Sequence, residues 1–164
     1  MLAFTGITRY PQPSMKQPTP AAFTEAEISL LNKAAAVAAQ NSYSPYSRFR
    51  VGAAILLEVA GGVPAGTIVA GTNVENASYR LTTCAEQAAI AAAVARFGPA
   101  IRIRAVAIAN LNSAACMPCG ACRQSIAEFA SPETPVFYPG STGEIVATTL
   151  AQLLPAAFSL DRQP

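Results

Sequence analysis

The chain has 164 residues, of which 52% are hydrophobic and 12% are charged, with a formal net charge of +2. This length fits one domain around a single core. The Lys and Arg residues are scattered and lack the basic stripe of a nucleic-acid-binding protein. No apolar run reaches the length of a membrane span, and the first residues lack the charged and apolar regions of a secretory signal. We therefore expect no nucleic-acid partner, no membrane partner and no export.

Among the residue types that usually bind metals or transfer protons, the chain has cysteine but no histidine. Four cysteines without a secretory signal indicate a reducing compartment, where thiols bind metal or do chemistry, so we expect a cytoplasmic protein. The chain contains no histidine, the commonest general base and metal ligand. Any zinc site must therefore use thiolates and carboxylates. The high apolar content favours burial between subunits, although a compact monomer with an alanine-rich core is the alternative.

The first half of the chain predicts one helix and two strands after a proline-rich start. We expect residues 1–22 to form a flexible N-terminal arm and residues 23–164 to form a single domain. A cap residue, early acids and helical apolar spacing predict a helix over residues 24–40. A loop rich in Ser, Pro and Tyr follows over 41–50. Apolar runs then predict strands over 51–59 and 67–74, joined by a glycine-rich turn.

The second half alternates between helices and strands. Helices are predicted over 83–97, within 116–130 and over 149–158, and strands over 103–110, 135–140 and 144–150. Alternation of this kind is typical of a mixed sheet covered by helices on both faces. The predicted fold class is α/β, a three-layer α/β/α sandwich with a central five-stranded mixed sheet.

The helix predicted at residue 83 opens with unusual chemistry. The sequence Thr83-Cys84-Ala85-Glu86 matches a capping box, in which Thr83 and Glu86 satisfy the free N–H groups of the first turn. A cysteine in an apolar helix is often only a small buried hydrophobe. The same residues also place a thiol and a carboxylate at the start of the helix, where they can serve a metal site.

The segment "PCGAC" opens another predicted helix with Cys119 and Cys122. A helix N-terminus lowers thiol pKa values, so this pair suits either a metal or a redox disulfide. The late position of the pair disfavours a thioredoxin-like redox motif. With Cys84, the pair offers three thiolate ligands, the number that catalytic zinc uses while keeping one position open. Cys116 is a possible fourth ligand, which would give a closed structural site.

Glu86 favours the catalytic alternative. It is a carboxylate two residues after a proposed ligand, placed to act on water at the metal. The order C-x-E…P-C-x-x-C matches the zinc deaminase signature in its three-cysteine form, with a glutamate that is not a ligand. We therefore predict Cys84, Cys119 and Cys122 as metal ligands and Glu86 as the catalytic residue.

Several longer blocks carry a resemblance to one family. The blocks are "YSPYSRFRVGAA", "GTNVENASY", "CAEQAAI", "PCGACRQ" and "LLPAAF", in family order between about residues 24 and 158. With them the chain resembles the small, homotetrameric cytidine deaminases of pyrimidine salvage. The resemblance implies one Zn²⁺ per chain, hydrolysis of cytidine and 2′-deoxycytidine to uridine and 2′-deoxyuridine with release of ammonia, and active sites at subunit interfaces.

The resemblance also implies roles for individual residues. Phe49 would stack on the pyrimidine ring, with Val51 in the same block. Asn73 and Glu75 would hydrogen-bond the ribose 3′-hydroxyl. The backbone of Ala85, together with Glu86, would hold the edge of the base. Tyr46 would form part of the pocket wall. Tyr79 and Phe158 would reach into a neighbouring subunit's site.

One residue near the predicted ligands departs from the family pattern, and a second could compensate for the change. Gln87 stands where most three-cysteine members have Arg. Because zinc with three thiolates carries excess negative charge, we hypothesise that Arg123 and the two helix N-termini compensate for it. Gln87 leaves open a related deaminase acting on N4-substituted cytidines or a blasticidin-like nucleoside. A structural zinc or protein-binding module is the alternative from another class.

Overall fold

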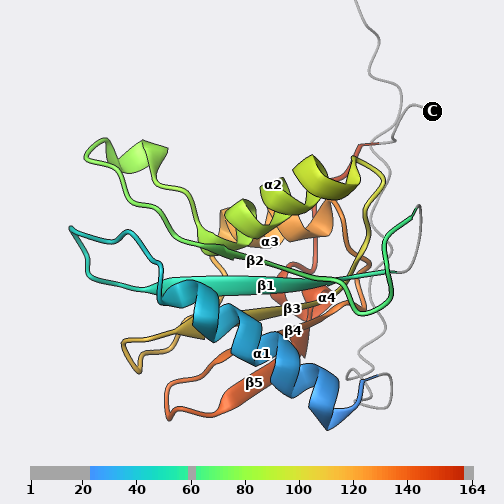
Figure 1. The fold of residues 1–164 in the computed structure, drawn as a ribbon, viewed down its shortest axis with the longest axis horizontal. Coiled ribbons are helices and arrows are strands. Elements are labelled where there is room, and N and C mark those ends of the chain that lie inside the picture. Colours follow the sequence, from blue (N-terminus) through green and yellow to red (C-terminus); the bar gives the residue numbers. More distant parts are fainter. Residues whose placement is uncertain (1–22, 59–61, 161–164) are drawn as a thin grey trace, which may run out of the picture.

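A five-stranded mixed sheet runs through the middle of the molecule, in the order β2-β1-β3-β4-β5 (Figure 1). The computed structural model describes residues 23–58 and 62–160, so the predicted N-terminal arm lies outside the described residues. β3 and β4 pair in parallel, and the other neighbours pair antiparallel. This confirms the predicted sheet. The strands are β1 (Val51–Leu57), β2 (Ile68–Thr72), β3 (Ile103–Asn110), β4 (Pro135–Pro139) and β5 (Ile145–Thr149).

Helices cover both faces of the sheet (Figure 1). One apolar cluster joins Leu31 and Ala35 of α1 to alternate residues of β1, and the other joins Ala85 and Ala89 of α2 to the intervening residues of β1. The three-layer prediction is therefore confirmed. None of the helices in the described ranges is long and apolar enough to cross a bilayer. The helices are α1 (Glu25–Ala39), α2 (Ala85–Phe97), α3 (Gly120–Ala127) and α4 (Leu150–Leu153), with a 3-10 turn, η2 (Tyr79–Leu81).

Two glycines allow α1 and α2 to lie directly on the sheet. A Cβ on Gly52 would lie 2.1 Å from the carbonyl oxygen of Ala35, and a Cβ on Gly71 would lie 2.3 Å from the nitrogen of Ala89. Gly71 pairs with Ala53, the neighbour of Gly52, so the two glycines face opposite sides of the sheet. The alanine-rich helices can therefore approach the strands closely on both sides.

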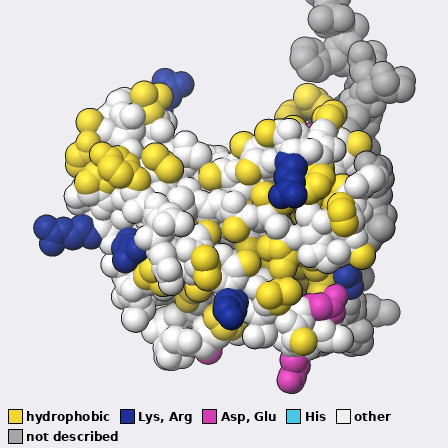
Figure 2. All heavy atoms as spheres, viewed as in Figure 1, with side chains coloured by type: hydrophobic (Ala, Val, Ile, Leu, Met, Phe, Trp, Pro, Cys, Tyr) yellow, Lys and Arg dark blue, Asp and Glu magenta, His cyan; other side chains and the backbone are white. Residues whose placement is uncertain are grey.

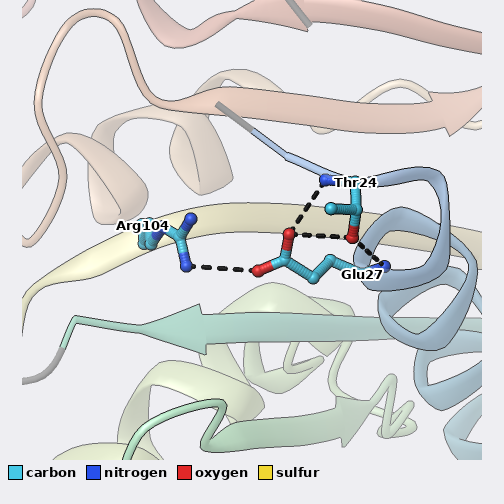
Figure 3. A network of polar contacts seen from close by, with 3 residues as sticks. All are labelled: Thr24, Glu27 and Arg104. Carbon is cyan, nitrogen blue, oxygen red and sulfur yellow. Dashed lines mark hydrogen bonds and ion pairs between the residues drawn. The ribbon is translucent and has the colours of Figure 1, made fainter. Parts of the chain in front are cut away.

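The start of α1 is held by a capping box and by an ion pair with the sheet (Figure 3). The Thr24 hydroxyl accepts from the Glu27 N–H at 3.2 Å, and the Glu27 carboxylate accepts from the Thr24 N–H at 2.9 Å. The same carboxylate lies 3.4 Å from Arg104 on β3. The guanidinium of Arg104 also stacks over Phe23. This confirms the predicted cap and fixes the end of α1 on the sheet.

The capping box predicted at Thr83 is wrong, because α2 begins two residues later. Cys84 is the N-cap residue, its backbone is extended, and it makes no side-chain cap hydrogen bond. Thr83 instead exchanges two backbone hydrogen bonds with Val74, at 2.9 and 3.0 Å. This short bridge keeps the chain extended through Thr83, so the helix starts at Ala85 and Cys84 points its thiol beyond the helix end.

Candidate metal centre

Three thiols converge where two helices begin. Cys84 is the N-cap of α2, Cys119 is the N-cap of α3, and Cys122 lies in the first turn of α3. Their sulfur atoms all lie within 4.8 Å of one another. Two thiolates that share a tetrahedral zinc, with Zn–S bonds of about 2.3 Å, lie about 3.8 Å apart. The donor set and its spacing therefore fit zinc.

The thiols polarise one another even without a metal. Hydrogen bonding from Cys122 is the main reason that the pKa of Cys84 falls to about 7, although burial and Glu86 oppose the shift. The same hydrogen bond and burial raise the pKa of Cys122. The metal-free chain therefore favours a thiolate at Cys84 that accepts a hydrogen bond from the Cys122 thiol. A soft metal cation can take the place of the proton between these two sulfur atoms.

Glu86 lies beside the thiols with almost no contact with water. Its side chain is 4% exposed, and burial raises its carboxyl pKa, opposed by hydrogen bonds from its own backbone N–H and from Cys122. A carboxyl with a raised pKa exchanges protons more readily near neutral pH than an exposed one. The site thus combines a three-thiol group with an adjacent buried carboxyl.

Cys116 is close to the site but is not part of the thiol group. Its sulfur does not belong to the cluster of Cys84, Cys119 and Cys122. Burial, with the negative charge of Glu86 and Cys84, raises its pKa to about 12. Cys116 packs against the apolar core, and its N–H donates to the Pro139 carbonyl at 3.0 Å. The geometry therefore favours a site with an open fourth position over a closed structural site.

Asn73 anchors the loop that precedes β1. Its side-chain oxygen accepts from the Ser42 hydroxyl at 2.6 Å and from the Val51 N–H at 2.9 Å, and its amide nitrogen donates to the Phe49 carbonyl at 2.8 Å. Asn73 is buried. These bonds occupy both lone pairs and one of the two amide hydrogens, so one N–H is left to reach a ligand.

Glu75 holds the middle of the same loop. Its carboxylate accepts from the backbone N–H groups of Tyr46 and Ser47, at 2.9 and 3.2 Å, and from the Ser47 hydroxyl. The Ser47 hydroxyl is also the main reason that the pKa of Glu75 is lowered. Asn73 and Glu75 therefore shape the segment that carries Tyr46, Phe49 and Val51. The contacts of Ser42 with Asn73 and of Ser47 with Glu75 were not predicted, because the sequence of a serine-rich loop does not show which hydroxyls face inward.

The comparisons with known proteins agree with this geometry. Residues 25–138 match the model of the cytidine and deoxycytidylate deaminase zinc-binding region. The chain belongs to this family. It is 44% identical over 123 residues to a cytidine deaminase of Sporosarcina psychrophila, covering 74% of this chain and 84% of that protein. It is 39% identical over 140 residues to a cytidine deaminase of Mycobacterium tuberculosis, covering 85% of this chain and 96% of that protein.

A solved structure extends the agreement to the fold. The cytidine deaminase of Burkholderia pseudomallei gives a TM-score of 0.69 at 37% sequence identity, covering 83% of this chain and all of that one. The matched zinc-binding region of the family includes all three clustered cysteines. The deaminase family and the thiol geometry together fit one zinc ion per chain.

The other residues predicted for the deaminase site differ in their burial. Ala85 and Val51 are buried at the starts of α2 and β1, on the same side of the sheet. Four aromatic side chains face outward at least in part, with Tyr79 the most open at 89% exposed. These four are Tyr46, Phe49, Tyr79 and Phe158.

Gln87 links the two helices that carry the cysteines. Its amide nitrogen lies 3.5 Å from the Ser125 hydroxyl, which donates to the Ala121 carbonyl at 3.0 Å. The side chain therefore reaches α3, one turn away from the ligand pair. Ser125 was not predicted, because a serine within a helix carries no local signal of a contact with another helix.

Arg123 binds backbone carbonyls around the site. Its guanidinium donates to the Pro118 carbonyl at 2.8 Å and to the Leu153 carbonyl at 2.9 Å. Pro118 directly precedes the ligand Cys119, and Leu153 ends α4. Arg123 thus holds the ligand loop against the C-terminal helix, while its compensation of the thiolate charge stays a prediction.

Proposed function

We propose that this protein is a zinc-dependent hydrolase that deaminates cytidine and 2′-deoxycytidine to uridine and 2′-deoxyuridine. One observation carries the proposal: three thiols converge at two helix starts, beside a buried carboxyl two residues from Cys84. The relatives named as cytidine deaminases support the same substrate class. We assign this reaction to pyrimidine salvage.

The chemistry follows from the residues around the thiols. Zinc held by Cys84, Cys119 and Cys122 supplies Lewis acidity that makes water nucleophilic near neutral pH. Glu86 takes a proton from the attacking water and delivers it to ring N3 as the water attacks C4. Glu86 then takes the second proton and passes it to the exocyclic amine, which leaves as ammonia. One buried carboxyl serves both steps, so the chemistry needs no histidine.

The substrate-binding residues are proposed to hold the nucleoside from two sides. Phe49 stacks on the base, with Tyr46 and Val51 completing that wall. Asn73 and Glu75 bind the ribose 3′-hydroxyl, Asn73 through its remaining N–H and Glu75 through a carboxylate lone pair. On the other side, the buried backbone of Ala85 holds the base edge next to Glu86.

We further propose a homotetramer with active sites at subunit interfaces. The segment between β2 and α2 forms a lobe whose outer surface is rich in apolar side chains (Figure 2). Val74, Tyr79 and Leu81 on this lobe are 45%, 89% and 64% exposed. Large exposed apolar patches usually mark contacts. In the assembly, Tyr79 and Phe158 enter a neighbouring subunit's site. The free cysteines support a reducing, cytoplasmic location.

A turnover panel tests the proposed substrate class. The purified zinc-loaded protein is given cytidine, 2′-deoxycytidine, an N4-methylated cytidine and blasticidin S. Loss of ultraviolet absorbance is followed for each, together with release of ammonia or, for the N4-methylated compound, of methylamine. We expect the first two to be consumed. Turnover of only the N4-modified compound or only blasticidin S would instead assign the protein to a related deaminase. Tight zinc binding without turnover of any substrate would indicate a structural module.

A further inference from the structure

The side chain of Gln124 holds the backbone of Phe158 at both of its polar groups. Its amide nitrogen donates to the Phe158 carbonyl at 2.7 Å, and its amide oxygen accepts from the Phe158 N–H at 3.1 Å. Gln124 follows Arg123, which binds the Leu153 carbonyl at the end of α4. Two consecutive residues of α3 therefore fix the C-terminal segment at two points.

This attachment fixes a side chain that has little to contact in its own chain. The Phe158 ring is 60% exposed, although its backbone is held on both sides. Fixing the backbone of a residue costs conformational entropy, and an exposed ring returns little hydrophobic free energy for that cost. An ordered backbone with an exposed ring is therefore suited to present the ring to another molecule.

The position of Gln124 ties this presentation to the metal centre. Gln124 lies two residues after the ligand Cys122, on the helix whose N-cap is the ligand Cys119. The helix that supplies two ligands to one site thus also orients the aromatic side chain at the C-terminal end of the same chain.

We propose that Gln124 is a positioning residue that presents Phe158 of one protomer to the nucleoside pocket of a neighbouring protomer. The inference rests on the proposed function, in which Phe158 enters a neighbour's site. It adds a specific connection: α3 binds the metal in its own protomer and completes the pocket of the next one. Gln124 therefore acts in trans, without touching the substrate.

Single variants give the first test. In Gln124→Ala, we expect kcat/KM for cytidine to fall about tenfold, the effect of roughly one lost contact of 1.4 kcal/mol. The change should lie mainly in KM, because Phe158 contacts the bound nucleoside. Gln124→Glu keeps the acceptor for the Phe158 N–H but places a carboxylate oxygen against the Phe158 carbonyl, so KM should rise in this variant as well. Gln40→Ala is the matched control, because exposed Gln40 makes its described hydrogen bonds through its backbone.

A double-mutant comparison separates positioning from general structure. If Gln124 acts through Phe158, adding Gln124→Ala to Phe158→Ala should change KM by less than twofold. A further tenfold loss would show that Gln124 acts by another route and would overturn the proposal. Zinc content and thermal unfolding of each variant identify any that fail to fold, and Gln124→Glu then takes the place of Gln124→Ala.

Mixed assemblies decide whether the effect crosses between protomers. Gln124→Ala protomers are co-expressed with an excess of Glu86→Ala protomers, which lack the catalytic carboxyl but keep Gln124 and Phe158. Only the Gln124→Ala protomers then have a site that can turn over cytidine. Because Glu86→Ala protomers are in excess, each such site receives Phe158 from a Glu86→Ala neighbour. We expect the KM of these sites to return to the native value.

The outcomes separate this inference from the proposed function. A KM that stays at the Gln124→Ala value in mixed assemblies would place the effect within one protomer and overturn the inference, while the proposed function would stand. A native KM in the single Gln124→Ala variant would also overturn it. If the unmodified protein does not consume cytidine at all, the proposed function fails first.

Discussion

Glu86 is a carboxyl whose pKa is raised by burial, next to thiols that favour a shared negative charge. This contrast lets the two kinds of group divide their tasks. The thiols hold the metal, whereas the carboxyl can both accept and donate a proton. At the residue scale, the proposed reaction depends on that single side chain.

Replacing Glu86 by glutamine should remove proton transfer and keep the shape of the site. We expect kcat for cytidine to fall by about 10²- to 10⁴-fold, while zinc content and the unfolding temperature stay close to native values. Absorbance assays and metal analysis measure these quantities. Turnover close to the native rate in Glu86→Gln would contradict the assignment of Glu86 as the proton carrier.

Arg123 combines a charge with two backbone hydrogen bonds, and two substitutions separate these contributions. Arg123→Gln removes the charge, so zinc affinity should fall about 10- to 100-fold and the basic group in the pH–rate profile should titrate at higher pH. Arg123→Lys keeps the charge, so it should retain the native pH profile even if it loses stability. Unchanged zinc affinity and pH profile in Arg123→Gln would refute charge compensation by this residue.

The helix starts show what local sequence can and cannot predict. At α1, the Thr24 capping box is complete within four residues, and the structure confirms it. At α2, the same pattern around Thr83 is overridden by a bridge to Val74, a residue that follows β2. The bridge moves the helix start to Ala85 and makes Cys84 the N-cap residue. The local sequence pattern predicted the helix, but the pairing of Thr83 with Val74 determines that the helix begins at Ala85.

Packing of α2 against the sheet controls where Cys84 lies. A Cβ at Gly71 would lie 2.6 Å from the Ala85 carbonyl, in the first turn of that helix. Gly71→Ala should therefore destabilise the fold by about 1–3 kcal/mol through overpacking and should weaken zinc binding. Gly120→Ala is the control, because nothing lies within 4 Å of its Cβ. Urea unfolding and zinc titration measure both effects, and equal behaviour of the two variants would contradict this account of α2.

The cluster of Cys84, Cys119 and Cys122 could be predicted from sequence because a few residue types at fixed spacing define the chemistry of a metal site. The supporting contacts could not. Gln124 stands in the block "PCGACRQ", but its partner is 34 residues away in the chain. Ser47 and Glu75 are 28 residues apart. Such pairs arise only when the tertiary fold brings distant loops together, so the residues that position the site become visible in the structure.

For the whole molecule, the apolar lobe between β2 and α2 is a surface suited to subunit contact (Figure 2). Tyr79→Ser with Leu81→Ser should reduce the proposed tetramer to smaller species at micromolar concentration, because it removes two exposed apolar side chains. Turnover should fall in parallel. Light scattering and cytidine assays measure both.

Ile145→Ser on β5 is the matched control, because Ile145 is also exposed but lies on the strand at the opposite edge of the sheet from β2. It should leave the assembly intact. A lobe variant that keeps the native mass and activity would contradict the role of the lobe in assembly.

The central claim is that three cysteines hold one zinc ion that the chain needs to deaminate cytidine. A zinc titration of the metal-free protein tests it directly, with cytidine turnover measured at each step. We predict that activity rises linearly and stops at one zinc per chain, and that Cys119→Ser and Cys122→Ser lose both the binding and the activity. Full cytidine turnover in the metal-free protein, or activity that does not follow zinc, would contradict the claim.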